Sequence, residues 1–313
     1  MTLYLIRRLA AGAVMVLSVS LATFTLLFAG GGDIARNLLG ENATNAQVAE
    51  KAAELGLDRP VVVQYLDWLG GALRGDFGVS WFSGETVTGA LGTRAEVTLS
   101  LVAGAIVLSA LAAVALGVWA AVRGGWVDRA LQAVSLLGIA LPGFLIALLL
   151  VTVFALQLGW LPATGFVMFQ DSPGDWLRSV VLPVIALGIG STVNLTQQIR
   201  GAVLDGLDQE WVRTLRARGL PQRRIVLRHV LPGAAGPALA VLGLQLVGLI
   251  GGAVVIEQVF AIPGIGQLAV NASVQGDIPA VMGLVVSTAV AVVVVNLLVD
   301  LAQYTLNPKL RLS

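Results

Sequence analysis

Residues 97–122 read VTLSLVAGAIVLSALAAVALGVWAAV. This stretch has 26 residues and no charged side chain, and about 20 apolar residues in an α-helix are enough to cross the hydrocarbon core of a bilayer. The rest of the chain has the same character, because 57% of its 313 residues are hydrophobic and 12% are charged. A typical globular protein has about 25% charged residues. The sequence therefore predicts an all-α integral membrane protein.

Five other stretches lack charged residues over a length close to that of a membrane span. With the first they predict six transmembrane helices, over 9–29, 97–122, 130–158, 180–198, 233–256 and 281–299. The third predicted span contains LPGF at 141–144. Because proline removes a backbone donor inside a helix, we expect a kink near Pro142.

The amino-terminal stretch has a second interpretation, because Arg7 and Arg8 precede an apolar run, as in a secretory signal peptide. The run is 21 residues long, whereas the apolar region of a typical signal peptide has about 7 to 15. We therefore expect this segment to stay uncleaved as the first span.

The distribution of Lys and Arg predicts the orientation, since short cytoplasmic loops are enriched in these residues. With the amino terminus inside, 13 of the 19 Lys and Arg residues fall on the cytoplasmic side and 6 on the other side. Both termini are then cytoplasmic. The predicted organisation is a first helix within 1–29, a large extracytoplasmic loop over 30–94, and a five-helix core over 95–313 that includes a cytoplasmic loop at 199–232.

The extracytoplasmic loop is too short for an enzyme domain of its own, and it predicts two helices. NATNAQVAEKAAELGL at 42–57 has Thr44 or Asn45 as a cap. VVVQYLDWLGGAL at 61–73 is amphipathic, and it either lies along the membrane surface or packs on the helix bundle. The aromatic residues that suit an interfacial position are Trp68, Trp81 and Phe82.

WVRTLRARGLPQRRIVLRHVLP at 211–232 holds six of the 19 Lys and Arg residues and the only histidine. On charge alone it is a cytoplasmic loop that fixes topology and contacts anionic lipid. Its pattern supports a second interpretation: a short helix over 208–218, a stop at Gly219, and a second helix over 222–230 that ends at Leu231-Pro232. Such a protruding helix-turn-helix suits docking to another protein.

The positions of Gly219 and Leu231-Pro232 resemble the EAA loop in permease subunits of bacterial ABC importers. That pattern has Glu-Ala-Ala, a glycine four residues on, and then Ile-x-Leu-Pro. In the dipeptide and oligopeptide branch the first part is commonly Arg-Thr-Ala-Arg-Ala-Lys-Gly. Two positions depart from these patterns, Leu215 from an alanine and His229 from an isoleucine. The corresponding residues here are Arg213, Thr214, Leu215, Arg216, Ala217, Arg218 and Gly219.

The resemblance extends in order over nearly the whole chain, and it is to the first-permease branch of the dipeptide, oligopeptide and nickel permeases. One departure is GGGDIAR after the first span, where Ile34 replaces the proline of the family's Gly-Asp-Pro. The other similar segments are 55–81, 141–165, 243–268 and 295–311.

This resemblance implies a permease in the bacterial cell membrane that forms half of a translocation path for di- or oligopeptides; nickel or another small solute remains an alternative. The partners it implies are a second homologous permease, two cytoplasmic ATP-binding subunits and an extracytoplasmic substrate-binding protein, besides membrane lipid and no nucleic acid. ATP hydrolysis would lie in the partners, so we expect no cofactor, metal or catalytic residue here. The 211–232 segment would be the contact that couples the ATP-binding subunits to the spans.

Polar residues within the predicted spans have two interpretations each. Asn194 and Gln197 either line the path, because polar groups facing lipid are costly, or mark the cytoplasmic boundary of their span. Glu257 either contacts a substrate or partner or is a capping or interfacial carboxylate. Gly248 and Gly252 have the spacing that lets helices pack closely.

Two other classes of function are alternatives. An intramembrane hydrolase needs a nucleophile beside a base, paired carboxylates or a metal site, and the chain offers one histidine, in the basic loop, and no HExxH motif. A secondary transporter predicts paired intramembrane charges or inverted repeats, and neither is evident. No P-loop motif for ATP hydrolysis occurs either.

Overall fold

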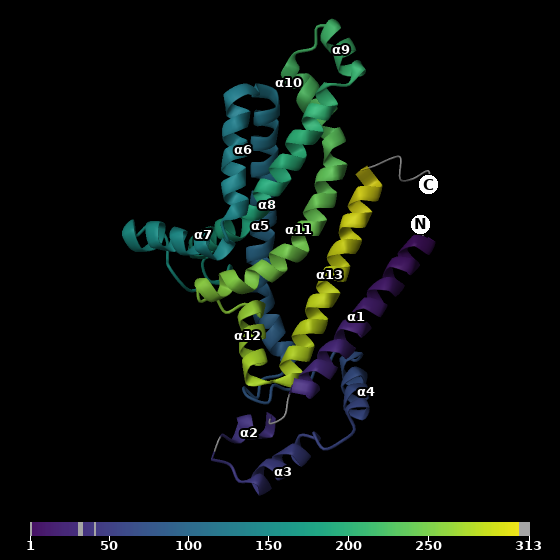
Figure 1. The fold of residues 1–313 in the computed structure, drawn as a ribbon, viewed down its shortest axis with the longest axis vertical. Coiled ribbons are helices and arrows are strands. Elements are labelled where there is room, and N and C mark those ends of the chain that lie inside the picture. Colours follow the sequence, from purple (N-terminus) through teal and green to yellow (C-terminus); the bar gives the residue numbers. More distant parts are fainter. Residues whose placement is uncertain (1, 31–33, 41, 307–313) are drawn as a thin grey trace. The chain divides into compact units, whose positions relative to one another are not determined.

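A computed structural model describes residues 2–30, 34–40 and 42–306 (Figure 1). Apart from one antiparallel bridge between Val79 and Thr86, these residues form helices and loops, which confirms the all-α class. The helices in chain order are α1 (Thr2–Gly30), α2 (Ile34–Leu39), α3 (Asn45–Glu54), α4 (Val61–Ala72), α5 (Val87–Arg123), α6 (Gly125–Ala140), α7 (Gly143–Leu150), the π-helical η1 (Val151–Gln157), α8 (Pro173–Leu207), α9 (Glu210–Ala217), α10 (Gln222–Ile225), the π-helical η2 (Val226–Val230), α11 (Leu231–Val259), α12 (Ile265–Gln275) and α13 (Ile278–Leu306).

Five of the six predicted spans are continuous helices. Each is long and apolar enough to cross a membrane, so the protein is a multi-pass membrane protein. Within the described ranges the five helices are Ile6–Phe28, Val87–Arg123, Pro173–Leu207, Gln222–Val259 and Ile278–Ala302.

The third predicted span is a helix pair rather than one kinked helix. Gly125–Ala140 and Gly143–Gln157 are bent by 100° at the break between them. Leu141 has extended backbone angles (φ −86°, ψ 123°), because a residue before proline disfavours the α conformation. The sequence therefore located the break, and the structure shows that it is much sharper than a kink.

The prediction that a helix ends at Leu231-Pro232 is wrong. The helix from Gln222 continues through η2 into α11, and Pro232 lies in the first turn of α11. In the π-helical turn before it, the N–H of Leu231 donates to the carbonyl of Val226, five residues earlier. This shift of hydrogen-bond register lets the chain accommodate the missing N–H of the proline.

The chain divides into two compact units, and the first comprises residues 1–97 and 263–294. In this unit α4 packs on α1, with Tyr65 buried between Phe24 of α1 and Trp68. α3 begins at the predicted cap, since the Thr44 hydroxyl accepts from the N–H of Gln47 in a capping box.

Asp277 joins the first unit across a long stretch of sequence. Its carboxylate accepts from the Ser80 hydroxyl at 2.5 Å and from the Trp81 N–H at 3.3 Å. The same buried side chain accepts from the N–H of Ala280 in the first turn of α13. Asp277 therefore fixes the turn that carries Trp81 against the start of α13.

The second unit comprises residues 98–262 and 295–313. Here α8 runs beside α11, and both lead to α9 and α10 at one end (Figure 1). A Cβ added to Gly252 of α11 would lie 3.1 Å from Leu187 of α8, whereas one added to Gly248 would meet open space. The predicted close packing therefore holds within the described chain for Gly252 and not for Gly248.

Candidate coupling loop and translocation face

The basic segment folds as a helical knob, which we define as residues 208–232. Its first helix, α9, is amphipathic: Val212 is fully buried and Leu215 is half-buried, while Trp211 is 43% exposed. In Figure 1, α9 and α10 lie beyond the nearby ends of α5 and α6. The other predicted site residues of this helix, Arg213, Thr214, Arg216 and Ala217, are exposed.

Gly219 ends α9 in the left-handed region, with φ +77°. Its N–H donates to the carbonyl of Arg216 at 2.9 Å, and the N–H of Leu220 donates to the carbonyl of Leu215 at 3.2 Å. These two bonds form a Schellman motif, which satisfies carbonyls at the helix end and favours glycine at this position. A Cβ at Gly219 would meet no atom within 4 Å, so the backbone angle is what requires glycine here.

A continuous apolar cluster, here called the knob core, seats the knob on the spans. Leu215 and Leu220 pack against it from the Schellman turn, so Leu215, the departure from the family pattern, points into the base of the knob. Leu231 also packs against this cluster, and Pro232 is exposed. Its buried members come from α5, α8, α9, α10 and η2: Ala113, Ala121, Leu195, Ile199, Val203, Val212, Ile225 and Val230.

The end of α8 and the π-helical turn η2, which carry the knob, approach each other closely. A Cβ added to Gly206 near the end of α8 would lie 2.6 Å from Cγ1 of Val230 in η2. α8 and the π-helical start of the helix that continues into α11 are therefore tightly packed at the base of the knob.

The outer surface of the knob is basic. Arg216 donates from Nε to the Oε1 of Gln222 at 3.2 Å, which joins α9 to α10. An open hollow in the knob has Pro221 and Leu227 in its lining together with three arginines. Such a surface complements an acidic surface of a partner protein. The exposed arginines are Arg213, Arg216, Arg218, Arg223, Arg224 and Arg228, and among the described residues no salt bridge joins them to a carboxylate.

α8 carries a polar stripe between the faces that pack on α6 and α11. Asn194 is exposed and Gln197 is half-buried. Asp205 continues the stripe at helical spacing, and Gly190 and Gly201 leave the same face without bulky side chains. This face of α8 is therefore open and polar, as the wall of a hydrophilic path needs to be.

An ion pair unforeseen from the sequence joins α6 to α8. Arg200 contacts the carboxylate of Asp128 through both Nε and Nη2, the second at 2.6 Å. Gln132 donates to the same carboxylate at 2.9 Å. The side chains of Arg200 and Asp128 are 20% and 18% exposed, so solvent screens this pair less than a surface pair.

We expect Asp128→Asn to destabilise the protein by about 1–3 kcal/mol, between the cost for a surface pair and that for a buried one. The cause is the unpaired guanidinium left on Arg200. Thermal unfolding of the purified protein measures the change, and the exposed Asp208→Asn is the matched control. The exchange of both charges, Asp128→Arg with Arg200→Asp, should restore part of the loss, since an arginine opposes the dipole at the start of α6. Equal stability of Asp128→Asn and Asp208→Asn would contradict a structural role for the pair.

Glu257 is fully buried near the end of α11. Its carboxylate accepts from the hydroxyl of Thr98 in α5 at 2.6 Å. Glu257 therefore links α11 to α5 within the second unit.

Comparison with known proteins now decides the family. Residues 113–312 match the family described as "Binding-protein-dependent transport system inner membrane component", and residues 1–102 match its amino-terminal part. The chain belongs to this family. The inferred resemblance to permease subunits of binding-protein-dependent importers is thereby confirmed, while the first-permease branch stays a prediction. The hydrolase and secondary-transporter alternatives are set aside.

The permease is also similar to named relatives over its full length. A protein of Sinorhizobium fredii (strain NBRC 101917 / NGR234) named as a probable peptide ABC transporter permease is 36% identical, with 99% of this chain and 100% of that protein covered. An oligopeptide transport system permease of Bacillus subtilis (strain 168) is 32% identical, with 99% of each chain covered.

Among solved structures, the fold is similar to a chain of the MetNI methionine ABC transporter in inward-facing conformations. The TM-score is 0.57 at 16% identity, and the match covers 69% of this chain and 96% of that chain. This likeness concerns the fold. Family membership implies ATP-binding and substrate-binding partners and a second permease in general.

The structure of the permease brings its predicted site residues into one unit. Asn194 and Gln197 lie on α8, and α8 leads directly into the knob after Leu207. From Gln197 to Leu207 the helix rises about 15 Å. The sequence analysis did not identify Asp128 or the residues of the knob core as part of the site. The only local signal for the knob core is the apolar spacing of Val212 and Leu215.

Proposed function

We propose that this permease forms one half of the translocation path of an ATP-driven peptide importer in the bacterial inner membrane. The knob is the contact for a cytoplasmic ATP-binding subunit, and the polar stripe of α8 borders the path. The observation that carries this proposal is the knob core, which joins the exposed basic helix α9 to α5, α8 and α10. A short helix seated in this way moves with the spans, whereas a solvated tether would not.

Two further observations support the proposal. The relatives matched over their full length carry names of peptide and oligopeptide permeases. The knob exposes its charged residues and buries Val212, Ile225 and Val230 in the knob core, while Trp211 and Leu227 stay exposed on its surface. When the ATP-binding subunits close, α8 and α11 would be displaced together, and the polar stripe would change its access from one side of the membrane to the other.

The remaining partners follow from the same proposal. The path needs a second wall, which we assign to a second, homologous and non-identical permease. The exposed glycines Gly248 and Gly251 of α11 would allow a helix of that permease to approach closely. Native mass measurement of the complex tests this pairing. A transport-competent complex with two copies of this chain would contradict the heteromeric form.

Transport in proteoliposomes tests the substrate class. The complete transporter, purified with its binding protein, should accumulate labelled di- or oligopeptides when ATP is supplied on the cytoplasmic side. A nickel chelate in a parallel assay distinguishes the alternative substrate of the same family. Nickel uptake without peptide uptake would overturn the peptide assignment and leave the permease assignment intact.

Cysteine labelling tests the proposed orientation, with both termini cytoplasmic. The chain has no cysteine, so a single Ala46→Cys in α3 reports the loop after α1, and Thr214→Cys reports the knob. A membrane-impermeant maleimide added outside should label the first and spare the second in intact cells. The reverse pattern would invert the topology.

A further inference from the structure

α4 presents three different sides along its 12 residues. One side packs on α1 through Tyr65 and Trp68. A second side is polar, with Gln64 and Asp67. The third is an apolar stripe at helical spacing, in which Val62 is 68% and Leu66 58% exposed; Leu73, the residue that caps the helix, continues the stripe and is 80% exposed.

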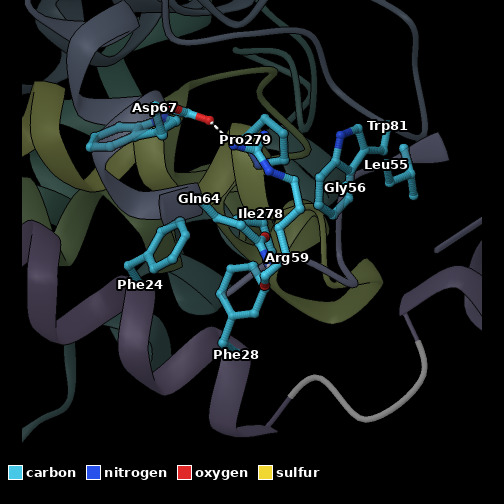
Figure 2. Close-up of a pocket in the computed structure, with 11 residues that line it drawn as sticks. Phe24, Phe28, Leu55, Gly56, Arg59, Gln64, Asp67, Trp81, Ile278 and Pro279 are labelled. Carbon is cyan, nitrogen blue, oxygen red and sulfur yellow. Dashed lines mark hydrogen bonds and ion pairs between the residues drawn. The ribbon is translucent and has the colours of Figure 1, made fainter. Parts of the chain in front are cut away.

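The polar side of α4 faces a pocket that is lined by α1, α4 and the start of α13 (Figure 2). Asp67 accepts from Arg59 at 2.5 Å, and Gln64 donates to the carbonyl of Arg59 at 2.7 Å. Arg59 and Asp67 are each about half exposed (49% and 59% of their side chains). This side of α4 is therefore open to water.

The contacts of Tyr65 place α4 at a defined depth along α1. Its hydroxyl lies 2.8 Å from that of Ser20, and its ring centroid lies 5.3 Å from that of Phe24. The apolar span of α1 continues to Phe28. Phe24 is four residues before this end, so the Tyr65 ring lies about 6 Å inside the end of the span.

We propose that α4 is an interfacial helix embedded in the leaflet at the carboxyl end of α1, with its apolar stripe on lipid. The apolar span of α1, on which α4 packs, also has exposed apolar side chains, since Leu21, beside Ser20, is 51% exposed. No charged residue interrupts the stripe, whereas the opposite polar side carries the Arg59–Asp67 pair. A helix with this division of sides lies in the plane between headgroups and acyl chains.

This assignment resolves the two alternatives that the sequence left open for residues 61–73. α4 packs on the bundle through one side and meets the membrane through another. In the orientation proposed above the leaflet is the outer one, and the pocket beside α4 opens at the outer membrane surface.

Nitroxide labels on single cysteines test the depth of α4 in the complete transporter reconstituted into phosphatidylglycerol and phosphatidylethanolamine vesicles. The test site is Leu66→Cys, and Leu73→Cys is a second site on the same stripe. Leu26→Cys, on a residue of α1 that is 73% exposed, is the lipid-facing control. Ala46→Cys, on the exposed polar helix α3, is the water-facing control.

We expect the ratio of collision with oxygen to collision with a water-soluble nickel chelate to be several-fold higher at Leu66 and Leu73 than at Ala46, and close to the ratio at Leu26. A ratio like that of Ala46 would place α4 in water and overturn the proposal. Low collision with both reagents would mean that a protein surface covers the stripe, which would overturn it equally. Because the readout is collision rather than transport, failure of the peptide assignment leaves this test unaffected.

Discussion

The Gly219→Val variant is expected to insert normally into the membrane and to lose most of its ATP-driven transport. Gly219 has φ +77°, where a residue with a Cβ costs about 1–2 kcal/mol. Open space surrounds the position, so the substitution acts on the turn rather than through a clash. A penalty of this size lowers the ratio of the native turn to other conformations by about 5- to 30-fold, and we expect transport to fall by up to this factor.

Gly233→Val is the matched control for this variant. Gly233 is also exposed and has open space around it, but it lies within a helix, where valine costs less than 1 kcal/mol relative to alanine. Measured in vesicles with the complete transporter, the control should keep its substrate-stimulated ATP hydrolysis. Full transport by Gly219→Val would mean that the loop only fixes topology.

A still larger effect is expected for Val212→Asp. Val212 is fully buried in the knob core, and an unpaired carboxylate there costs several kcal/mol. That cost exceeds the stabilisation from the apolar contacts of one short helix. We therefore expect α9 to lose its packing on the knob core, while α5, α8 and α11 stay in the membrane. We expect transport at background level.

Thr214→Asp places the same charge on the exposed side of the same helix. It should leave α9 packed on the knob core. The two variants therefore distinguish loss of that packing from the effect of an added negative charge. Amide hydrogen exchange over 210–217 measures the seating directly, and it should rise strongly only in Val212→Asp. Equal exchange and equal transport in the two variants would contradict the role of the knob core.

The sequence predicted where the chain crosses the membrane better than where its helices end. The second predicted span begins at Val97, whereas α5 begins at Val87, because Arg94 and Glu96 end the charge-free stretch but not the helix. α8 likewise continues past Arg200 to Leu207. A charge-free stretch ends at the first charged residue, whereas the helix that contains it continues beyond that residue.

Two prolines that look alike in sequence have different outcomes. At Pro142 the helix breaks by 100°, and at Pro232 it continues after a π-helical turn. Each proline removes one backbone donor. What differs is the surrounding packing, since Val230 is held against Gly206 and the knob core, and one sequence read locally does not contain that information.

The candidate site was predictable only where its signals are local. The sequence predicts a short helix over 208–218 with a stop at Gly219, and the structure has a helix over Glu210–Ala217 followed by Gly219 in the left-handed region. Asp128 and Arg200 are 72 residues apart, so neither indicates the other in the sequence. The same holds for Ser80 and Asp277, at 197 residues.

Photo-cross-linking from the knob tests the coupling claim most directly. A photoreactive residue replaces Arg216, which is exposed on α9, in the complete transporter in its native membrane. The account predicts one major cross-linked product, with the ATP-binding subunit, whose yield changes when ATP is added. The same photoreactive residue at Arg74, in the loop after α1, should give no such product. Cross-links from Arg216 to lipid alone, or to the ATP-binding subunit equally from both positions, would contradict the assignment of residues 208–232 as the coupling element.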